Sequence, residues 1–506
     1  MDRTLIHKDT YHDSVFLMAV SAELAADSSL EAAHVVLGTP ANLQLLQEQG
    51  FSLEAGLTPT DLIIALRAET DEALDAATIR AEELLTAAAR PTGDGAEEAP
   101  VGLDGAHARM PDASLALISV PGDYAAYEAG KAMDRGLNVM IFSDNVTVAD
   151  EVALKQKASD LGLLCMGPDC GTSLVGGVPL GFANRVRPGA IGLVGASGTG
   201  LQEVSCQIHR LGGGVTHILG TGGRDLGSDV GGVTTLAALD LLADHPETEV
   251  LVVVSKPPAR EVADRVVARL AELDEPAVII FLGEQGRQTP DGVHVAHTLA
   301  EAAAVAVRLA RGEAPGGEAE APEVDAAALA EGLGPDQRRI HGLFCGGTLA
   351  SEAVLLLGQL GLDVESNLGS GHELPSYEGH TVVDLGDDRF TRGRPHPMIE
   401  PSQRNEQIVA LGSQPQTAAL LLDVVLGSGS HTDPAGAALP ALAEARQANP
   451  GLVVVASVTG TDLDAQDLAA QQAALRDAGV VLLPSNAVAC QAVAELVSAH
   501  VKEEAR

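Results

Sequence analysis

The chain has 506 residues, with 70 Asp plus Glu against 31 Lys plus Arg and a net charge of −39. At roughly 150 residues per domain, this length predicts about three domains. A surface this negative repels nucleic acids and anionic lipids, and an aromatic content of 2 % offers few stacking platforms, so both classes of partner are excluded. A small anionic ligand must be held by local cations or by backbone N–H groups.

The cysteines and the N-terminus point to a cellular compartment. The five cysteines form no CxxC pair, so we expect free thiols in a reducing compartment and no zinc ribbon. The first residues lack the apolar core of a signal peptide, and no apolar run approaches the about 18 residues of a membrane span. The sequence therefore predicts a soluble, cytoplasmic protein.

The N-terminal segment alternates short apolar runs with helical stretches. Runs at 33–39 and 61–66 predict strands, and the apolar periodicity of 70–88 predicts a helix. We therefore expect a small α/β N-terminal domain over residues 1–90. Residues 90–108 are rich in Pro, Gly and acidic side chains and predict a linker.

The rest of the chain repeats a strand–helix pattern. Nearly continuous apolar strands separated by helices predict parallel sheets covered on both faces, which is an α/β fold. We expect domains over 110–188, 189–311 and 338–500. An acidic segment rich in Gly and Pro predicts a linker over 312–337.

Three glycine-rich turns follow predicted strands. Such a turn at the start of a helix presents free backbone N–H groups and a partial positive charge to an anion. The turns do not fit a Walker A loop or the dinucleotide fingerprint, and the simpler interpretation of tight turns without a ligand stays open. Because the carboxyl ends of parallel strands meet at one edge, the turns predict a phosphate cradle. Its candidate residues are Ser197, Gly198, Thr199, Gly200, Gly346, Gly347, Thr348, Gly427, Ser428 and Gly429.

A few cationic side chains stand out against the acidic background. Arg224 lies on a glycine-rich loop, and Arg394 and Arg404 belong to a locally basic stretch, so each is a candidate for a substrate carboxylate. His431 and His396 are candidates for donating to a phosphoryl or carbonyl oxygen. The alternatives are loops tethered by weak surface ion pairs and histidines that cap their own turns. No carboxylate cluster or HExxH motif predicts a catalytic metal.

The motifs carry a family resemblance. The stretches SVPGDYAAYEAGKAMDRG, CMGPDCGTSLVGG and AIGLVGASGTGLQEV resemble the α subunit of succinyl-CoA synthetase over residues 113–310. Residues 338–496 resemble the CoA-ligase domain that ends the β subunit of that enzyme. The chain is more closely similar to the FdrA family, which combines both parts. This resemblance implies a Rossmann-like CoA-binding domain followed by two flavodoxin-like CoA-ligase domains.

The resemblance also implies roles for particular residues. The turn at 197–199 matches the α-subunit turn that faces the active-site phosphate, and 427–429 falls where the β subunit supplies the opposing helix. Positions that contact CoA in the ligases correspond to Val120, Pro121, Asp169 and Cys170. Cys170 also reads as an inert packing residue, because a lone cysteine in a glycine loop is usually buried.

Two departures from the ligases shape the functional expectation. The ligases carry a phosphohistidine in a Gly-His-Ala-Gly motif, whereas His294 and His297 here lie outside such a motif. No segment resembles an ATP-grasp domain. The FdrA family is associated with oxamate carbamoyltransferase, which converts carbamoyl phosphate and oxamate to oxalurate and phosphate in allantoin catabolism and needs companion subunits. We expect this activity, with a small anionic substrate, carbamoyl phosphate or phosphate.

Under that expectation the glycine turns hold the leaving phosphate, Arg394 or Arg404 holds the oxamate carboxylate, and His431 or His396 polarises the carbamoyl carbonyl. Two alternatives stay open. One is an acyl-CoA ligase that needs a partner ATP-grasp chain, and the other is a non-catalytic regulatory subunit. No cofactor is required by the first expectation, and CoA stays open as a ligand.

Overall fold

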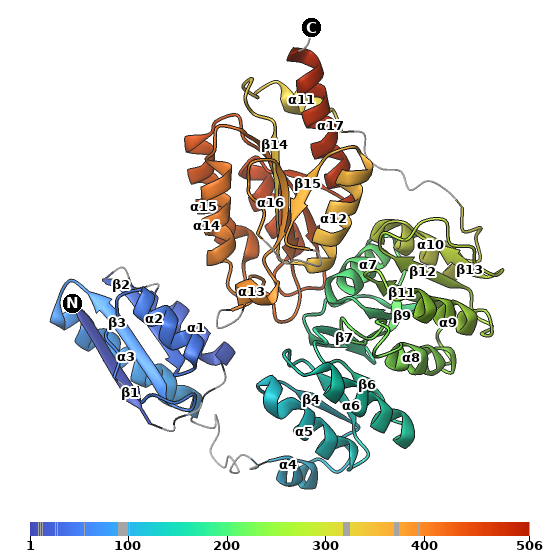
Figure 1. The fold of residues 1–506 in the computed structure, drawn as a ribbon, viewed down its shortest axis with the longest axis horizontal. Coiled ribbons are helices and arrows are strands. Elements are labelled where there is room, and N and C mark those ends of the chain that lie inside the picture. The colour runs from blue at the N-terminus through green and yellow to red at the C-terminus, as the bar shows by residue number, and fades with distance from the viewer. Residues whose placement is uncertain are drawn as a thin grey trace. The chain divides into compact units, whose positions relative to one another are not determined.

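The computed structural model describes the chain except residues 9, 11, 13, 26, 28, 55, 90–99, 101, 317–323, 369–373, 392–394 and 505–506. The chain divides into two compact units, each described here by itself (Figure 1). The first contains Met1–Val101 with Asp388–Pro395, and the second contains Gly102–Asp387 with His396–Arg506.

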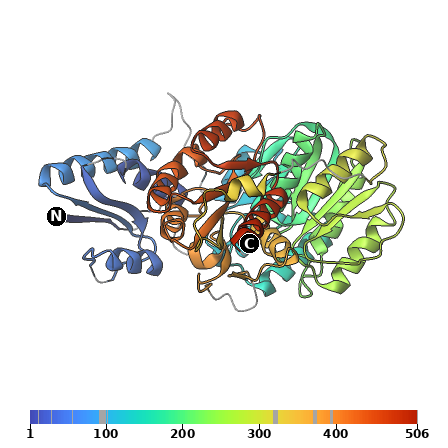
Figure 2. The same ribbon diagram turned by 90° about the horizontal axis from the view of Figure 1, so that it is seen from above.

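The first unit is built on a three-stranded antiparallel sheet of order β1-β3-β2, seen in blue in Figure 2. Its strands are β1 (Asp2–His7), β2 (Leu30–Leu37) and β3 (Leu62–Ala68), and its helices are α1 (Ser14–Ala25), α2 (Pro40–Glu48), α3 (Asp71–Ala89) and the short α13 (Asp388–Thr391). Leu17 of α1 and Leu74 of α3 share a core with Ile64, whereas Leu46 of α2 packs with Ile63. Successive residues of a strand face opposite sides, so α2 covers the other face.

The second unit begins with a small parallel sheet. Its strands are β4 (Leu115–Ile118), β5 (Asn138–Ile141) and β6 (Cys165–Met166), and its helices are α4 (Leu103–Arg109), α5 (Gly122–Met133) and α6 (Val148–Leu161). The strand–helix alternation predicted from residue 113 onward is confirmed here. Thr147 caps the start of α6, and Gly162 ends it in the left-handed conformation that glycine adopts without strain.

A seven-stranded sheet follows, with the order β13-β12-β11-β9-β10-β7-β8. Its elements are β7 (Thr172–Val175), β8 (Val178–Gly181), β9 (Pro188–Ala196), α7 (Gly198–Arg210), β10 (Val215–Gly220), α8 (Val233–Ala243), β11 (Val250–Ser255), α9 (Arg260–Leu270), β12 (Ala277–Phe281), β13 (Val293–Val295) and α10 (Leu299–Ala310). Strands β9 to β13 are parallel, and the β7–β8 hairpin adds an antiparallel edge that the apolar pattern does not predict. In Figure 1, α7 and α10 lie on one side of this sheet and α8 and α9 on the other.

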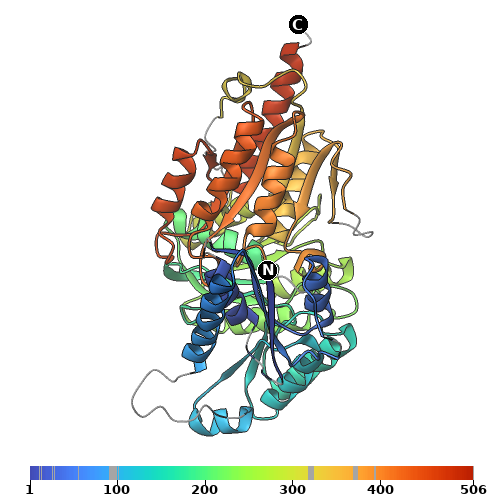
Figure 3. The ribbon, with the colours of Figure 1, turned by 90° about the vertical axis from the view of Figure 1, so that its left-hand side faces the viewer.

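The C-terminal part forms a six-stranded, wholly parallel sheet of order β15-β16-β14-β17-β18-β19 (Figure 3). Its elements are α11 (Ala326–Ala330), β14 (Arg339–Phe344), α12 (Gly347–Gln359), β15 (Val364–Ser366), β16 (His380–Asp384), α14 (Ser402–Gly412), β17 (Thr417–Val425), α15 (Pro434–Ala448), β18 (Val453–Thr459), α16 (Leu468–Asp477), β19 (Val481–Leu483) and α17 (Asn486–Glu504). Helices α12 and α17 pack on each other, as do α14 and α15. The predicted α/β fold is confirmed.

The two large sheets of the second unit share a hydrophobic core. Leu201 of α7 and Ala303 of α10 belong to the same buried cluster as Leu349 of α12 and Val493 of α17. These four helices therefore form the layer between the sheets, and the start of α7 meets the start of α12 within it. Over the described residues, no helix combines the length and the hydropathy that a membrane crossing requires.

Candidate anion-binding site at two helix starts

The starts of α7 and α12 touch through their hydroxyl side chains. The Oγ of Ser197 lies 2.7 Å from the Oγ1 of Thr348, and the backbone N–H of Thr348 donates to the Oγ1 of Thr199 at 3.3 Å. Neither helix has a side-chain hydrogen bond at its N-cap. The first turn of a helix leaves N–H groups without intrahelical partners, so two partial positive charges meet here.

Glycines permit this close approach. A Cβ on Gly195 would lie 2.3 Å from the Val254 carbonyl oxygen, and one on Gly346 would lie 3.0 Å from Thr199 Cγ2. The hydroxyl residues of both turns are buried, whereas Gly198 and Gly347, the first residues of the two helices, are half-buried. A ligand can therefore reach the backbone N–H groups past glycine residues, which have no side chains to block it.

A buried carboxylate fixes the turn before α12. Asp423 in β17 accepts hydrogen bonds from the backbone N–H groups of Cys345 at 2.8 Å and Gly346 at 2.7 Å. Arg404 donates to the Asp423 carbonyl at 2.8 Å, and its guanidinium lies 3.6 Å from the Asp423 carboxylate. Burial raises the pKa of Asp423, and Arg404 opposes that rise. Arg404 thus serves to neutralise Asp423.

This placement corrects the expectation that Arg404 holds a substrate carboxylate. Its side chain is 3 % exposed, and its charge faces Asp423. Arg394, the other candidate in the same stretch, lies outside the described residues.

A lysine and an aspartate flank the start of α12. A Cβ on Gly347 would lie 2.4 Å from Asp384 Oδ2 and 3.2 Å from Lys256 Nζ. Asp384 ends β16, and its Oδ1 accepts from the Gly386 N–H at 2.9 Å. Burial raises the pKa of Asp384 to about 6, and the positive charge of Lys256 opposes the rise. Neither residue was among the sequence candidates, although each is a polar residue at the end of an apolar strand.

His396 lies beside the same aspartate. A Cβ on Gly386 would lie 2.7 Å from His396 Nε2 and 3.2 Å from Asp384 Oδ1. The His396 ring packs at 5.4 Å from the Phe182 ring, and its Nδ1 accepts from the Met398 N–H at 3.2 Å. Burial lowers the pKa of His396 to about 4, so the imidazole is neutral at physiological pH. A neutral imidazole can donate one proton in a hydrogen bond.

The loop around Gly427 is bound to the segment after β8 and to Met398. The Ser428 N–H donates to the Ala183 carbonyl at 2.9 Å, and the His431 N–H donates to the Met398 carbonyl at 2.7 Å. The His431 ring accepts from the Asp433 N–H at 3.0 Å. His431 therefore caps its own turn, which is the alternative interpretation given for this histidine. The following helix, α15, is capped by Asp433 itself.

The helix that opposes α7 is therefore α12, and the assignment of that role to residues 427–429 is corrected. The three glycine turns lie in one part of the second unit, because Asn184 donates to the Leu426 carbonyl at 2.9 Å and accepts from Gln202 of α7 at 3.1 Å. Two of them meet, and the third packs on the segment after β8.

The residues expected near CoA gather around Ser143 at the carboxyl ends of β4 to β6. Ser143 Oγ accepts from the Val120 N–H at 3.0 Å, and its carbonyl accepts from the Asp169 N–H at 3.0 Å. Pro121 precedes α5 as its N-cap. Cys170 is buried, and burial raises the pKa of its thiol to about 11, so it is not a ready nucleophile.

Arg224 lies near this second group rather than at the helix starts. Its Nε is 2.8 Å from Glu151 Oε2, and it donates to the Val146 carbonyl at 2.8 Å. The side chain is 43 % exposed, so part of the guanidinium remains accessible. A carboxylate of the protein thus occupies the position expected for a substrate carboxylate.

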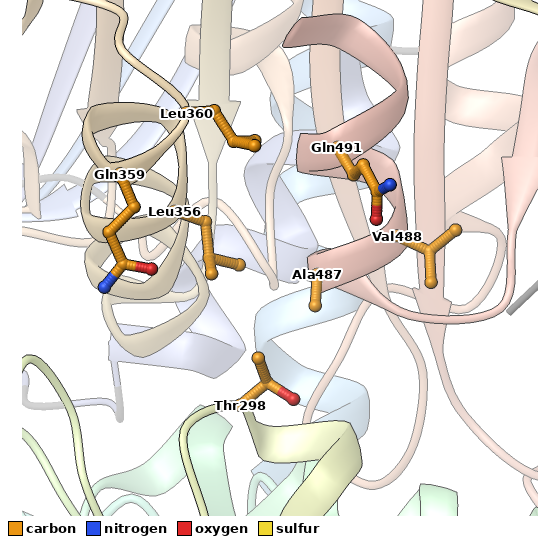
Figure 4. Close-up of a pocket in the computed structure, with 7 residues that line it drawn as sticks. All are labelled: Thr298, Leu356, Gln359, Leu360, Ala487, Val488 and Gln491. Carbon is orange, nitrogen blue, oxygen red and sulfur yellow. The ribbon is translucent and has the colours of Figure 1, made fainter. Parts of the chain in front are cut away.

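A pocket of about 200 Å³ lies elsewhere, between α12 and α17 (Figure 4). Its lining residues are Thr298, Leu356, Gln359, Leu360, Ala487, Val488 and Gln491. The lining contains no ionisable side chain and none of the residues at the helix starts. The candidate anion site is therefore distinct from this pocket.

Comparison with known proteins assigns the chain to a family. YahF of Escherichia coli K12 is 40 % identical over 508 residues, which cover 96 % of each chain. The chain belongs to the FdrA-like family. This family shares the fold of the NDP-forming acyl-CoA synthetases: residues 186–283 match the CoA binding domain family, and residues 343–496 match the CoA-ligase family. The resemblance inferred from the motifs is confirmed.

Other relatives of this FdrA-like protein cover less of it. Succinate–CoA ligase (ADP-forming) subunit alpha 2 of Archaeoglobus fulgidus is 29 % identical over 195 residues, covering 37 % of this chain and 64 % of that one. The solved dinucleotide forming acetyl-coenzyme A synthetase 1 of Ca. Korarchaeum cryptofilum is 16 % identical, with a TM-score of 0.30, and the match covers 78 % of this chain and 84 % of that one.

Residues 1–100 match the family described as AllF, heavy metal-associated domain. This segment contains no cysteine, so thiolate ligands for a soft metal are lacking. In the described ranges, no three His, Cys, Asp or Glu side chains are grouped so as to hold a metal ion. These residues do not fit a heavy-metal site, and no function is derived through one.

Proposed function

We propose that this FdrA-like member of the acyl-CoA synthetase superfamily is a carbamoyltransferase subunit that transfers the carbamoyl group of carbamoyl phosphate to oxamate, giving oxalurate and phosphate. The observation that carries the proposal is the meeting of the uncapped starts of α7 and α12 at Ser197 and Thr348. Backbone N–H groups and hydroxyls there suit the oxygens of a phosphoryl group.

The geometry suits a reaction in which phosphate leaves. The acceptor nitrogen attacks the carbamoyl carbon, the bond from that carbon to the phosphate oxygen breaks, and the nitrogen gives up one proton. Negative charge then develops on the departing phosphate, and preorganised N–H donors stabilise it without reorganising. A chain with a charge of −39 avoids concentrating lysine and arginine by using helix starts for this task.

The histidine positions support the use of a ready-made acyl phosphate. The segment after β12 lacks the Gly-His-Ala-Gly motif, His294 lies within β13, and His297 is exposed. A covalent phosphohistidine step therefore has no obvious residue in this segment. Carbamoyl phosphate already carries its activated group and needs no such step.

The test is an assay of the full chain, alone and with its co-purified companion subunits, using carbamoyl phosphate and oxamate. We expect oxalurate and phosphate in equal amounts, with no requirement for ATP or CoA. Replacing Ser197 and Thr348 together with alanine should lower the rate at least about tenfold, because hydrogen bonds to a charged group are worth about 1.5–3 kcal/mol. Full activity in that double variant would favour a non-catalytic, regulatory role for this chain.

A second candidate is an acyl-CoA ligase that works with a separate ATP-grasp chain. It is favoured by the two CoA-related family matches and by the cluster around Ser143. Val120, Pro121 and Asp169 would contact CoA, with the exposed part of Arg224 as the neighbouring cation for its phosphates. This function predicts saturable CoA binding that Arg224→Ala weakens, together with a phosphoenzyme after incubation with ATP and the partner. Oxalurate formation without CoA would contradict it.

A further inference from the structure

Lys256 differs from the other lysines whose side chains the structure describes in having no ion pair. The sequence contains six lysines, and the side chains of five are described. Four of these form ion pairs, namely Lys8, Lys131, Lys155 and Lys157. Within the described part of the chain, Lys256 forms neither an ion pair nor a hydrogen bond. A half-buried lysine without a direct ion pair can bind an anionic ligand.

Asp384 presents the complementary feature beside the same glycine, Gly347. The residue is 6 % exposed, and its Oδ1 accepts from the Gly386 N–H. Its Oδ2 has no hydrogen-bond donor among the described residues, and it is the atom directed at Gly347. This oxygen is not one of the fully buried side-chain atoms that lack a partner, so it keeps some exposure and can accept from a ligand N–H or O–H.

Together the two groups define the ligand. Lys256 can bind an anionic oxygen and Asp384 Oδ2 can accept a hydrogen bond, and both atoms lie near the α-carbon of Gly347 at the start of α12. We infer that Lys256 and Asp384 bind the acceptor substrate, a small carboxylate that carries an adjacent N–H group, with the carboxylate on Lys256 and the N–H on Asp384. This inference rests on the proposed function and assigns its acceptor site.

The position also assigns a chemical role. When the acceptor nitrogen attacks the carbamoyl carbon, the N–C bond forms, the bond from that carbon to the phosphate oxygen breaks, and the N–H proton passes to Asp384 Oδ2. The phosphate leaves toward the adjoining starts of α7 and α12. Asp384 is then a general base that touches the substrate, and Lys256 orients it.

The charges around Asp384 set its behaviour with pH. Lys256 attracts its ionised form, whereas Asp387 and Asp423 repel it, and burial outweighs these effects and raises the pKa of Asp384 to about 6. The neighbouring His396 is uncharged near neutral pH, because burial lowers its pKa. A base with this pKa is ionised at pH 7 and still basic enough to accept a proton.

The first experiment measures oxamate binding to the full chain by calorimetry, with inorganic phosphate as a second probe. Lys256→Met and Asp384→Asn should each weaken oxamate binding at least about tenfold, as expected for loss of a hydrogen bond to a charged group. Lys131→Met is the matched control, because Lys131 pairs with Glu128 on α5. Asp384→Asn should leave phosphate binding within about threefold of wild type. Oxamate binding that is unchanged in both variants would overturn the inference.

The second experiment follows oxalurate formation against pH in the reconstituted complex. The kcat/KM of the wild type should rise as pH increases through about 6, and Asp384→Asn should lose both the rate and this rise. Wild-type oxalurate formation that persists in Asp384→Asn and Lys256→Met would overturn the acceptor site and leave the proposed function standing. Oxamate binding that depends on Lys256, without any oxalurate formed, would instead contradict the proposed function alone.

Discussion

Two lysines of the second compact unit lie near carboxylates, and their surroundings differ sharply. Lys155 is fully buried, lies 2.8 Å from Glu151 Oε1 and 2.7 Å from Asp225 Oδ1, and donates to the Thr221 carbonyl at 2.9 Å. Lys256 is half-buried near Asp384 and forms none of these bonds within the described chain.

The difference separates a structural cluster from a binding site. Asp225 also accepts from the N–H groups of Thr234 and Thr235, so the Lys155 cluster joins α6 to the start of α8 and leaves no room for a ligand. Charges in such a cluster compensate one another. Around Lys256 the compensation is incomplete, and an incoming ligand can complete it. Four predictions test this contrast.

The largest effect is expected at Lys155. Lys155→Met leaves Glu151 and Asp225 buried with no lysine between them, and the loss of one partner from a buried ion pair costs about 3–5 kcal/mol. Urea unfolding of the full chain should show this decrease in the free energy of unfolding. A loss below about 1 kcal/mol would mean that the cluster is not structural.

The next effect concerns Asp384 and pH. Its pKa is about 6 in the folded chain and 3.8 in the unfolded chain, so between these values the folded state keeps a proton that the unfolded state has lost. Stability conferred by the protonated form is therefore present at pH 3.8 and is lost as pH rises to 6. The Asp384→Asn variant does not lose stability in this way. Its free energy of unfolding should therefore rise by about 1–3 kcal/mol relative to that of the wild type between pH 4 and 7.

Urea unfolding of both proteins at several pH values measures that gain, and substitution of the exposed Asp274 by asparagine is the control. A gap between wild type and Asp384→Asn that stays constant with pH would contradict the raised pKa of Asp384.

A smaller effect is expected where the two helix starts meet. Ser197→Ala removes the partner of the buried Thr348 hydroxyl and should cost about 1 kcal/mol. Thr348→Val should cost a similar amount, and the double variant should cost less than the sum, since no hydroxyl is then left unpaired. Denaturant unfolding of the four proteins gives the coupling energy, and strict additivity would show that the 2.7 Å contact is not a stabilising hydrogen bond.

The smallest effect on stability is expected at Lys256. Lys256→Met breaks no ion pair in the described chain and should change the free energy of unfolding by at most about 0.5 kcal/mol at pH 7. Replacement of lysine by methionine is thus expected to destabilise the protein at Lys155 and to leave its stability nearly unchanged at Lys256. A loss at Lys256 comparable to that at Lys155 would remove the distinction between them.

Much of the secondary structure could be predicted from local pattern. The strand–helix alternation after residue 113 appears as β4 to β6, and the turn at Ser197 does start a helix after a strand. The β7–β8 hairpin was not predicted, because its two strands have only 4 residues each and lie between two longer parallel units. The domain boundaries at 110–188, 189–311 and 338–500 remain predictions.

The candidate site was harder to predict, because its parts come from distant segments. Gly346 to Thr348 were recognised as one of three equivalent turns, and only packing shows that α12, rather than the loop at 427–429, meets α7. Arg404 was selected for its charge, yet the fold buries it against Asp423. Lys256 and Asp384 were overlooked, although a polar residue at the end of an apolar strand was a usable signal.

The sequence by itself determined the α/β class, the family and the presence of helix starts suited to anions, because hydrophobic period and glycine placement are local properties. Tertiary structure alone decided which turns meet and which charges remain uncompensated. Lys155 and Lys256 look alike in the sequence, since each is a lysine in an acidic chain. The free energy of a charged group depends on its burial and its neighbours, and those are set only when distant segments of the second unit pack together.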